Sequence, residues 1–106
     1  MLGIMVVPSK LYTVYDEETG KLLKREEVAV SEINRGSIVT GALHPGDIIN
    51  SITVDGVEYK AIRRYIVIEA MINARVGSDI VISITREGQR IDYTVEVTES
   101  SLTLIK

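Results

Sequence analysis

The chain has 106 residues, a formal net charge of −3 and no cysteine. This length suits one domain with a modest core and is too short for two domains. The charge excludes a basic face for nucleic acid or anionic lipid, no apolar run approaches the roughly 20 residues of a membrane-spanning helix, and the lack of cysteine excludes disulfides and thiolate metal sites.

The first third of the chain predicts two strands with a polar insertion between them. Residues 2–7 form a short apolar run that Pro8 interrupts. Residues 11–24 have an acidic, glycine-containing centre, which predicts a polar hairpin or excursion. A second strand is predicted over 28–33. Ser37 is placed to cap a short helix that runs to Ala42.

The middle of the chain alternates turn signals with regular elements. His44-Pro45-Gly46-Asp47 has the proline and glycine positions of a type II turn. A strand over 48–54 then leads through Asp55-Gly56, a hairpin signal, into residues 57–59.

Residues 62–74 predict the longer helix, because they contain no proline or glycine and end shortly before Gly77. The apolar residues of this helix lie on more than one face, so a second apolar face requires a partner besides the core. A buried strand over 65–68 is the alternative, since β-branched residues are frequent there.

The last part of the chain predicts a hairpin of two strands, over 79–85 and 91–97, joined by residues 86–90. Residues 99–106 are either a tail or an added edge strand. The whole pattern predicts a mostly β fold of the α+β kind, a partly open barrel or sandwich of five to six strands with one short and one longer helix.

No catalytic or metal centre is predicted. One histidine and no cysteine exclude most nucleophile–base pairs. His44, Asp47 and Ser51 do not form a triad, because His44 precedes a proline in a tight turn and no nucleophile elbow is present. The acidic run at 16–18 lacks the spacing of a calcium loop and is read as a solvated hairpin tip. We therefore expect no catalytic residue, no metal and no cofactor in this chain.

The order of the motifs resembles the signature of PDZ domains. That signature is a strand, Gly-Ser, a short helix ending Ala-Gly-Leu, Gly-Asp, a second strand and Asn-Gly. The matching stretches are Val30 to Ser37, Gly41-Ala42-Leu43, Pro45 to Ile49 and Val54 to Val57. Residues 76–97 look like the closing helix exit and hairpin, so the resemblance covers residues 1 to about 98. The chain departs from the pattern at Ser37-Ile38-Val39, where the family has Ser-Pro-Ala, and no histidine begins the long helix.

A binding loop that comes first and a hairpin that closes the chain resemble the bacterial PDZ arrangement. Leu2-Gly3-Ile4 is similar to the step that HtrA/Deg trypsin-like serine proteases have in their PDZ modules. The resemblance implies one peptide-binding domain over 1–98. A peptide would add as a strand beside Met5, Val6 and Val7, and its carboxylate would bind main-chain N–H groups around Leu2, Gly3 and Ile4. The helix side of the groove would be Arg64, Val67, Ile68 and Met71, unless these residues simply fill the core.

The resemblance also implies the partners and the parent protein. The partners would be peptide or protein C-termini with an apolar last residue, and the protease domain of the same parent chain, with no nucleic acid and no membrane insertion. The parent would be a trypsin-like serine endopeptidase working outside the cytoplasm, in the periplasm or cell envelope. The alternatives are a scaffold or secretion component, a C-terminal-processing protease and an intramembrane metalloprotease. We expect the chain to be a module cut from a larger protein at the edge of its own site.

Overall fold

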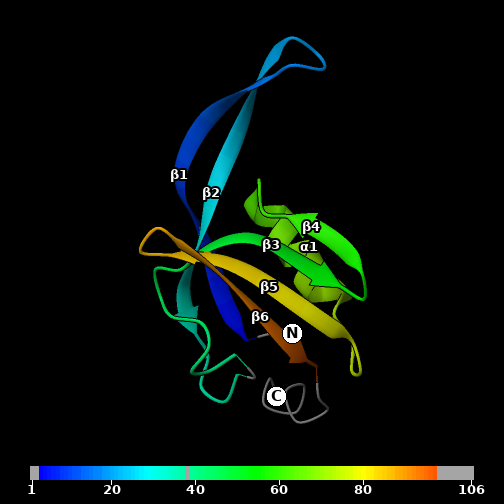
Figure 1. Ribbon diagram of the computed structural model, residues 1–106. Helices are drawn as coiled ribbons and strands as arrows, with labels where there is room; N and C mark the ends of the chain where they lie inside the picture. The colour runs from blue at the N-terminus through cyan, green and yellow to red at the C-terminus, as the bar shows by residue number, and fades with distance from the viewer. Residues whose placement is uncertain (1–2, 38, 98–106) are drawn as a thin grey trace.

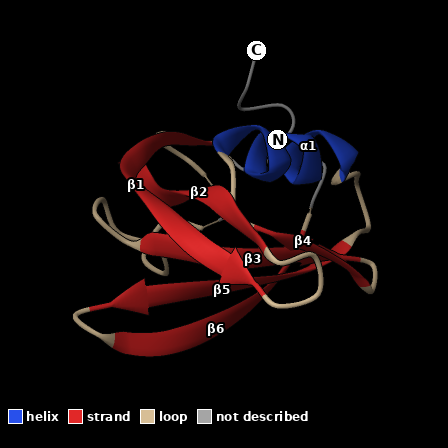
Figure 2. Ribbon diagram, turned by 90° about the horizontal axis from the view of Figure 1, so that it is seen from above, coloured by secondary structure: helices blue, strands red, loops and turns tan. Residues whose placement is uncertain are grey.

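The computed structural model describes residues 3–37 and 39–97, which form an antiparallel sheet of six strands and one helix. The predicted tail or edge strand at 99–106 lies outside the described residues. The sheet has the order β1-β2-β3-β5-β6, with β4 paired to β3, and α1 covers one face of the curved sheet (Figures 1 and 2). The elements are β1 (Ile4–Asp16), β2 (Lys21–Ile33), β3 (Ile48–Val54), β4 (Val57–Lys60), α1 (Arg64–Asn73), β5 (Asp79–Arg86) and β6 (Gln89–Glu96).

This architecture confirms the predicted mostly β fold and is consistent with a PDZ-like α+β arrangement. The core is aliphatic and lies between the sheet and α1. On β5, Ile80, Ile82 and Ile84 alternate toward the core and are fully buried. They pair with core residues of β3, and α1 contributes Val67, Ala70 and Met71 to the same core cluster. Each such side chain contributes about 1.5–3 kcal/mol by leaving water.

The predicted turns form as their residue types require. Gly46 has a φ of 96°, and the Asp47 N–H donates to the His44 carbonyl at 3.1 Å. Asp55 and Gly56 both have positive φ, as a type I′ hairpin turn needs. The predicted α1 also forms, over Arg64–Asn73, so the alternative of a buried strand at 65–68 is wrong.

Pro8 does not interrupt the first strand, contrary to the prediction. β1 continues through Pro8, which is opposite Val28, and reaches Asp16. The register shifts between Pro8 and Lys10. Among the described strands β1 is the last one on its side of the sheet. A proline is tolerated on such an edge strand and at a bulge, where its missing N–H breaks no ladder.

The short helix predicted from Ser37 to Ala42 is also wrong for the residues described there. Residues 39–43 form consecutive turns. Gly41 has a φ of 87°, which no α-helix contains. The Ser37 hydroxyl accepts a hydrogen bond from the Val39 N–H at 3.2 Å. The side chain that was predicted to cap a helix thus stabilises a turn.

The predicted hairpin over 11–24 exists and is longer than a local excursion. β1 and β2 extend from the body as a two-stranded projection, which we call the arm and define as residues 10–25 (Figure 1). The molecule is accordingly 46 Å long and only 26 by 24 Å across. The arm is not uniformly polar, since Leu11, Tyr15 and Leu22 are 60–71% exposed on it.

Candidate functional site

The predicted carboxylate-binding loop has the backbone that its glycine was expected to allow. Gly3 has a φ of 71°, a left-handed conformation that favours glycine. A Cβ at this position would lie 3.2 Å from the Ser37 Cβ. The Gly3 carbonyl accepts a hydrogen bond from the Asn34 N–H at 2.7 Å, which fixes the loop to the end of β2. Leu2, the first residue of the predicted loop, lies outside the described residues.

The hydrogen bonds at the start of β1 fix the direction of its main-chain groups. In a trans peptide the C=O and the next N–H point in opposite directions, and the described residues have no cis peptide. The Gly3 carbonyl points toward Asn34, so the Ile4 N–H points away from β2. The Met5 carbonyl accepts a bond from the Ser31 hydroxyl of β2 at 3.1 Å, so the Val6 N–H also points away from β2. Both donors therefore face the open edge of β1.

Arg64, at the start of α1, contacts this same edge. Its Nε donates to the Val6 carbonyl at 2.7 Å. This bond places the first turn of α1 beside the β1 segment that was predicted to receive a peptide strand. The Val6 carbonyl thus also faces the open edge, where it already accepts a hydrogen bond from the Arg64 side chain.

The side chains of the predicted strand segment divide between the core and solvent. Ile4 and Val6 are buried in the core, at 7% and 2% exposure, whereas Met5 and Val7 are exposed. Ile4 and Val6 therefore offer an incoming strand mainly their outward main-chain groups. This alternation follows from the two-residue period of a strand.

The predicted helix residues lie on different sides of α1. Val67 and Met71 are buried core residues. Ile68 is partly buried at the edge of the core, and Arg64 contacts β1. Arg64 and Ile68, four residues apart, thus form one side of α1.

Two exposed apolar residues of α1 were not assigned to the site from the sequence. Tyr65 and Ile72 are 66% and 64% exposed. With Ile68 they have the spacing i, i+3, i+7, which places them on one stripe of the helix. This stripe is the second apolar face that the sequence predicted. The i, i+3, i+7 spacing of these three apolar residues in the sequence could have identified this stripe, once the residues of α1 that face the core were known.

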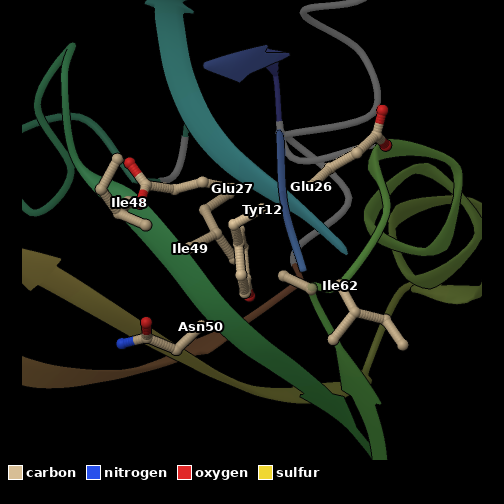
Figure 3. Close-up of a pocket in the computed structure, with 8 residues that line it drawn as sticks. Tyr12, Glu26, Glu27, Ile48, Ile49, Asn50 and Ile62 are labelled. Carbon is tan, nitrogen blue, oxygen red and sulfur yellow. The ribbon is translucent and has the colours of Figure 1, made fainter. Parts of the chain in front are cut away.

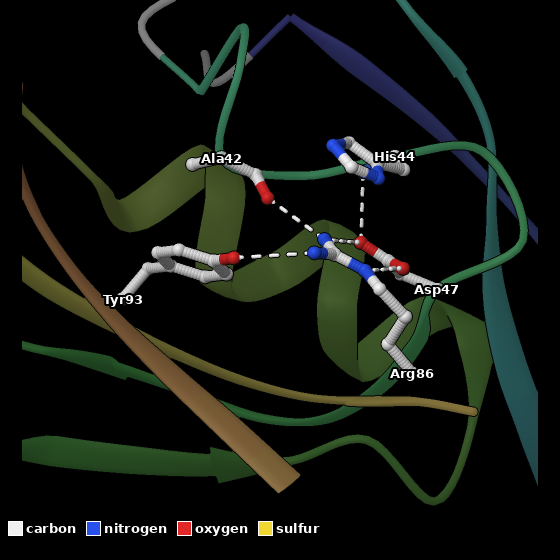
Figure 4. Close-up of polar contacts among 5 residues, drawn as sticks. All are labelled: Ala42, His44, Asp47, Arg86 and Tyr93. Carbon is white, nitrogen blue, oxygen red and sulfur yellow. Dashed lines mark hydrogen bonds and ion pairs between the residues drawn. The ribbon is translucent and has the colours of Figure 1, made fainter. Parts of the chain in front are cut away.

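An ion pair between the partly exposed Arg86 and the buried Asp47 fixes the loop that precedes β3 (Figure 4). Arg86 donates from Nε and Nη2 to the two carboxylate oxygens of Asp47, at 2.8 and 2.7 Å, and from Nη2 to the Ala42 carbonyl at 2.8 Å. Asp47 is 2% exposed. The hydrogen bonds from Arg86, with a further one from the His44 main-chain N–H, hold the pKa of the Asp47 carboxyl below its usual value against the effect of burial.

Neighbouring groups from the loop and from β5 hold the Asp47 carboxylate. Its carboxylate binds the main-chain N–H of His44 at 2.7 Å and the guanidinium of Arg86. The geometry is that of a structural clamp between the loop and β5.

One cavity of about 200 Å³ lies at the base of the arm, where Tyr12 of β1, residues of β2 and β3, and residues 61–62 line it (Figure 3). Its acidic residues already have partners. Glu26 accepts the Arg64 N–H at 2.7 Å, and Glu27 accepts the Ser9 hydroxyl at 3.3 Å. Within residues 3–37 and 39–97 no group of histidine, aspartate and glutamate is arranged to hold a metal ion. None of the lining residues belongs to the predicted peptide site.

Comparison of the chain with protein-family models gives no match, and comparison with curated proteins gives no significant match. None of the helical segments in the part of the chain that the structure describes is long and apolar enough to cross a membrane.

Proposed function

We propose that this domain binds extended peptides with a free, apolar C-terminus by strand addition to the edge of β1 beside α1. The observation that carries the proposal is the direction of the main-chain groups. The N–H groups of Ile4 and Val6, two residues apart, face the open edge together with the Val6 carbonyl. A two-residue spacing of outward groups is the pattern that an added β-strand binds.

The backbone at Gly3 supports binding of the peptide carboxylate. The left-handed φ of Gly3 turns the chain immediately before the outward N–H of Ile4. Main-chain N–H groups beside such a turn form concave sites for anions. The side chain of the last peptide residue would contact Ile68 and the exposed Ile72 of α1, and this contact would favour an apolar residue there.

The bond from Arg64 to Val6 limits the affinity. An incoming peptide N–H must share or replace this donor at the Val6 carbonyl. A short peptide that forms few main-chain bonds and loses one existing bond is expected to bind weakly, with a dissociation constant of order 10–100 μM.

The test is isothermal titration calorimetry with one peptide ending in valine, as the free acid and as the C-terminal amide. We expect the amide to bind at least tenfold more weakly, because it lacks the charge that the N–H groups bind. Equal affinities for acid and amide would refute the carboxylate site.

A pair of matched variants tests the position of the groove. Ile72→Lys places a charge on the α1 stripe, and Val57→Lys places the same charge at an exposed apolar residue of β4. We expect the first variant to weaken peptide binding at least fivefold and the second to leave it unchanged. Equal effects of the two variants would locate the site elsewhere.

The resemblance to PDZ modules is the basis for a proposal about the parent protein. We propose that this domain recognises substrates for an HtrA-like serine endopeptidase of the cell envelope, in which the catalytic residues belong to another domain. A Gly-Asn-Ser-Gly-Gly-type nucleophile motif in the gene sequence upstream of this segment would support the proposal. A membrane-embedded zinc motif there would contradict it.

A further inference from the structure

The arm has an open strand edge that the peptide-binding proposal does not use. Among residues 3–37 and 39–97, β1 is the terminal strand of the sheet, and Lys10–Asp16 pair with β2 on one side only. The register shift between Pro8 and Lys10 separates this stretch from the edge at Ile4–Val7. A two-stranded ribbon is marginally stable alone, and an open edge with exposed apolar residues is a template for another strand.

The sequence of this edge is complementary to itself. If two copies of β1 pair antiparallel about a two-fold axis at Thr13, Lys10 lies opposite Asp16 of the second copy. Leu11 then lies opposite Tyr15, Tyr12 opposite Val14, and Thr13 opposite Thr13. One kind of pair thus joins opposite charges, two kinds join largely apolar side chains, and the central pair joins two hydroxyl groups. Each of these cross-strand pairs is favourable.

The charges of β2 extend the complementarity across both arms. Within one arm Lys10 is opposite Glu27, and Asp16 is opposite Lys21. In the paired arrangement these residues form a row on one face of a four-stranded sheet. Its signs alternate: Glu27, Lys10, then Asp16 and Lys21 of the second copy. Directly opposed strand residues lie on the same face, so each charge has an opposite neighbour.

The other edge of the arm is unsuited to the same pairing. An antiparallel pair of β2 edges centred on Leu23 would place Lys21 opposite Arg25 of the second copy, which is a like-charge pair. In addition, Nη2 of Arg63 donates to the Lys24 carbonyl at 2.9 Å and occupies part of that edge. The β1 edge is therefore the one that favours a second copy.

We propose that two copies of this chain form a symmetric dimer by antiparallel pairing of Lys10–Asp16 at the β1 edge of the arm, with Thr13 at the two-fold axis. A seven-residue strand pair provides about six to eight main-chain hydrogen bonds. It buries less than the roughly 800 Å² per partner of a standard interface, so the dimer is weak and concentration-dependent. The peptide edge at Ile4–Val7 stays open in it.

Sedimentation velocity of the wild-type chain between about 1 and 100 μM tests the association directly, and we expect monomer at the low end and dimer at the high end. Thr13→Glu is the decisive variant. Within one arm the new carboxylate faces Lys24, so the hairpin is preserved, whereas at the axis two carboxylates face each other. We expect at least a tenfold weaker dimer, with an unchanged melting temperature. Thr13→Val is the matched control and keeps the dimer.

Because the chain contains no cysteine, single introduced cysteines can test the register of the proposed pairing between the two β1 strands. Thiols introduced by Thr13→Cys would lie opposite each other, within the distance that a disulfide spans. Thiols introduced by Tyr15→Cys, two residues further on, would lie about 14 Å apart. We expect rapid oxidation to a covalent dimer only for Thr13→Cys. A wild-type chain that is monomeric at 100 μM, a Thr13→Glu variant that dimerises normally, or equal crosslinking of the two cysteine variants would overturn the proposal.

Discussion

The bond between Arg64 and the Val6 carbonyl gives the sharpest prediction about peptide affinity. In the Arg64→Met variant the aliphatic stem is retained and the donor is lost. The Val6 carbonyl then has no side-chain donor and is free to accept a peptide N–H. Loss of a hydrogen bond from a charged donor is typically worth 1.5–3 kcal/mol, and because Arg64 is exposed to solvent we take a lower value of about 1 kcal/mol. Peptide binding should therefore become about fivefold tighter.

Arg63→Met is the matched control for this experiment. Arg63 is the neighbouring residue and also donates to a main-chain carbonyl, at Lys24 of β2. Both variants remove one positive charge, so any general attraction of the peptide carboxylate is reduced alike in both. Calorimetry with the valine-ending peptide should give a tighter complex for Arg64→Met than for Arg63→Met. An equal or weaker complex would refute the competition between Arg64 and the peptide.

Three further predictions concern stability, each measured by denaturant unfolding. Asp47→Asn should cost about 2 kcal/mol at pH 7. The pKa of Asp47 is lowered in the folded state, so its carboxylate stabilises the fold above about pH 4 and loses this effect as the pH falls through the folded pKa. The difference in the free energy of unfolding between wild type and Asp47→Asn should therefore shrink at low pH; a constant difference would contradict this. Ser83→Ala should stabilise by about 1 kcal/mol, because the buried hydroxyl has no partner among the described residues, and a loss of stability would refute it. Gly3→Ala should destabilise the fold more than Gly20→Ala, because Gly20 has nearly the same positive φ but no close contact such as the one to Ser37. Equal losses of stability would show that the contact to Ser37 costs no free energy.

Local signals in the sequence were sufficient to predict most turns and regular elements. Asp55-Gly56 formed the predicted hairpin because its geometry depends on two residues alone. The same holds for the turn at Pro45 and Gly46. Pro8 was misread because its effect depends on which side of the strand is paired, and this is a property of the whole sheet.

The candidate site was predictable only in part. The need for glycine at position 3 follows from local backbone geometry, and the structure places it in the left-handed region. The bond between Arg64 and Val6 joins residues 58 positions apart, so no local pattern could indicate it. For the same reason the sequence could not separate Val67 and Met71, which are in the core, from Ile72, which is exposed.

The most direct test of strand addition is amide hydrogen exchange by NMR, with and without a saturating peptide. The N–H groups of Ile4 and Val6 face the open edge, whereas the N–H of Val7 points toward β2, because the Val6 carbonyl points away from it. The account predicts that the peptide slows exchange at Ile4 and Val6 at least tenfold and leaves Val7 unchanged. Peptide binding that leaves the exchange of Ile4 and Val6 unaltered would contradict it.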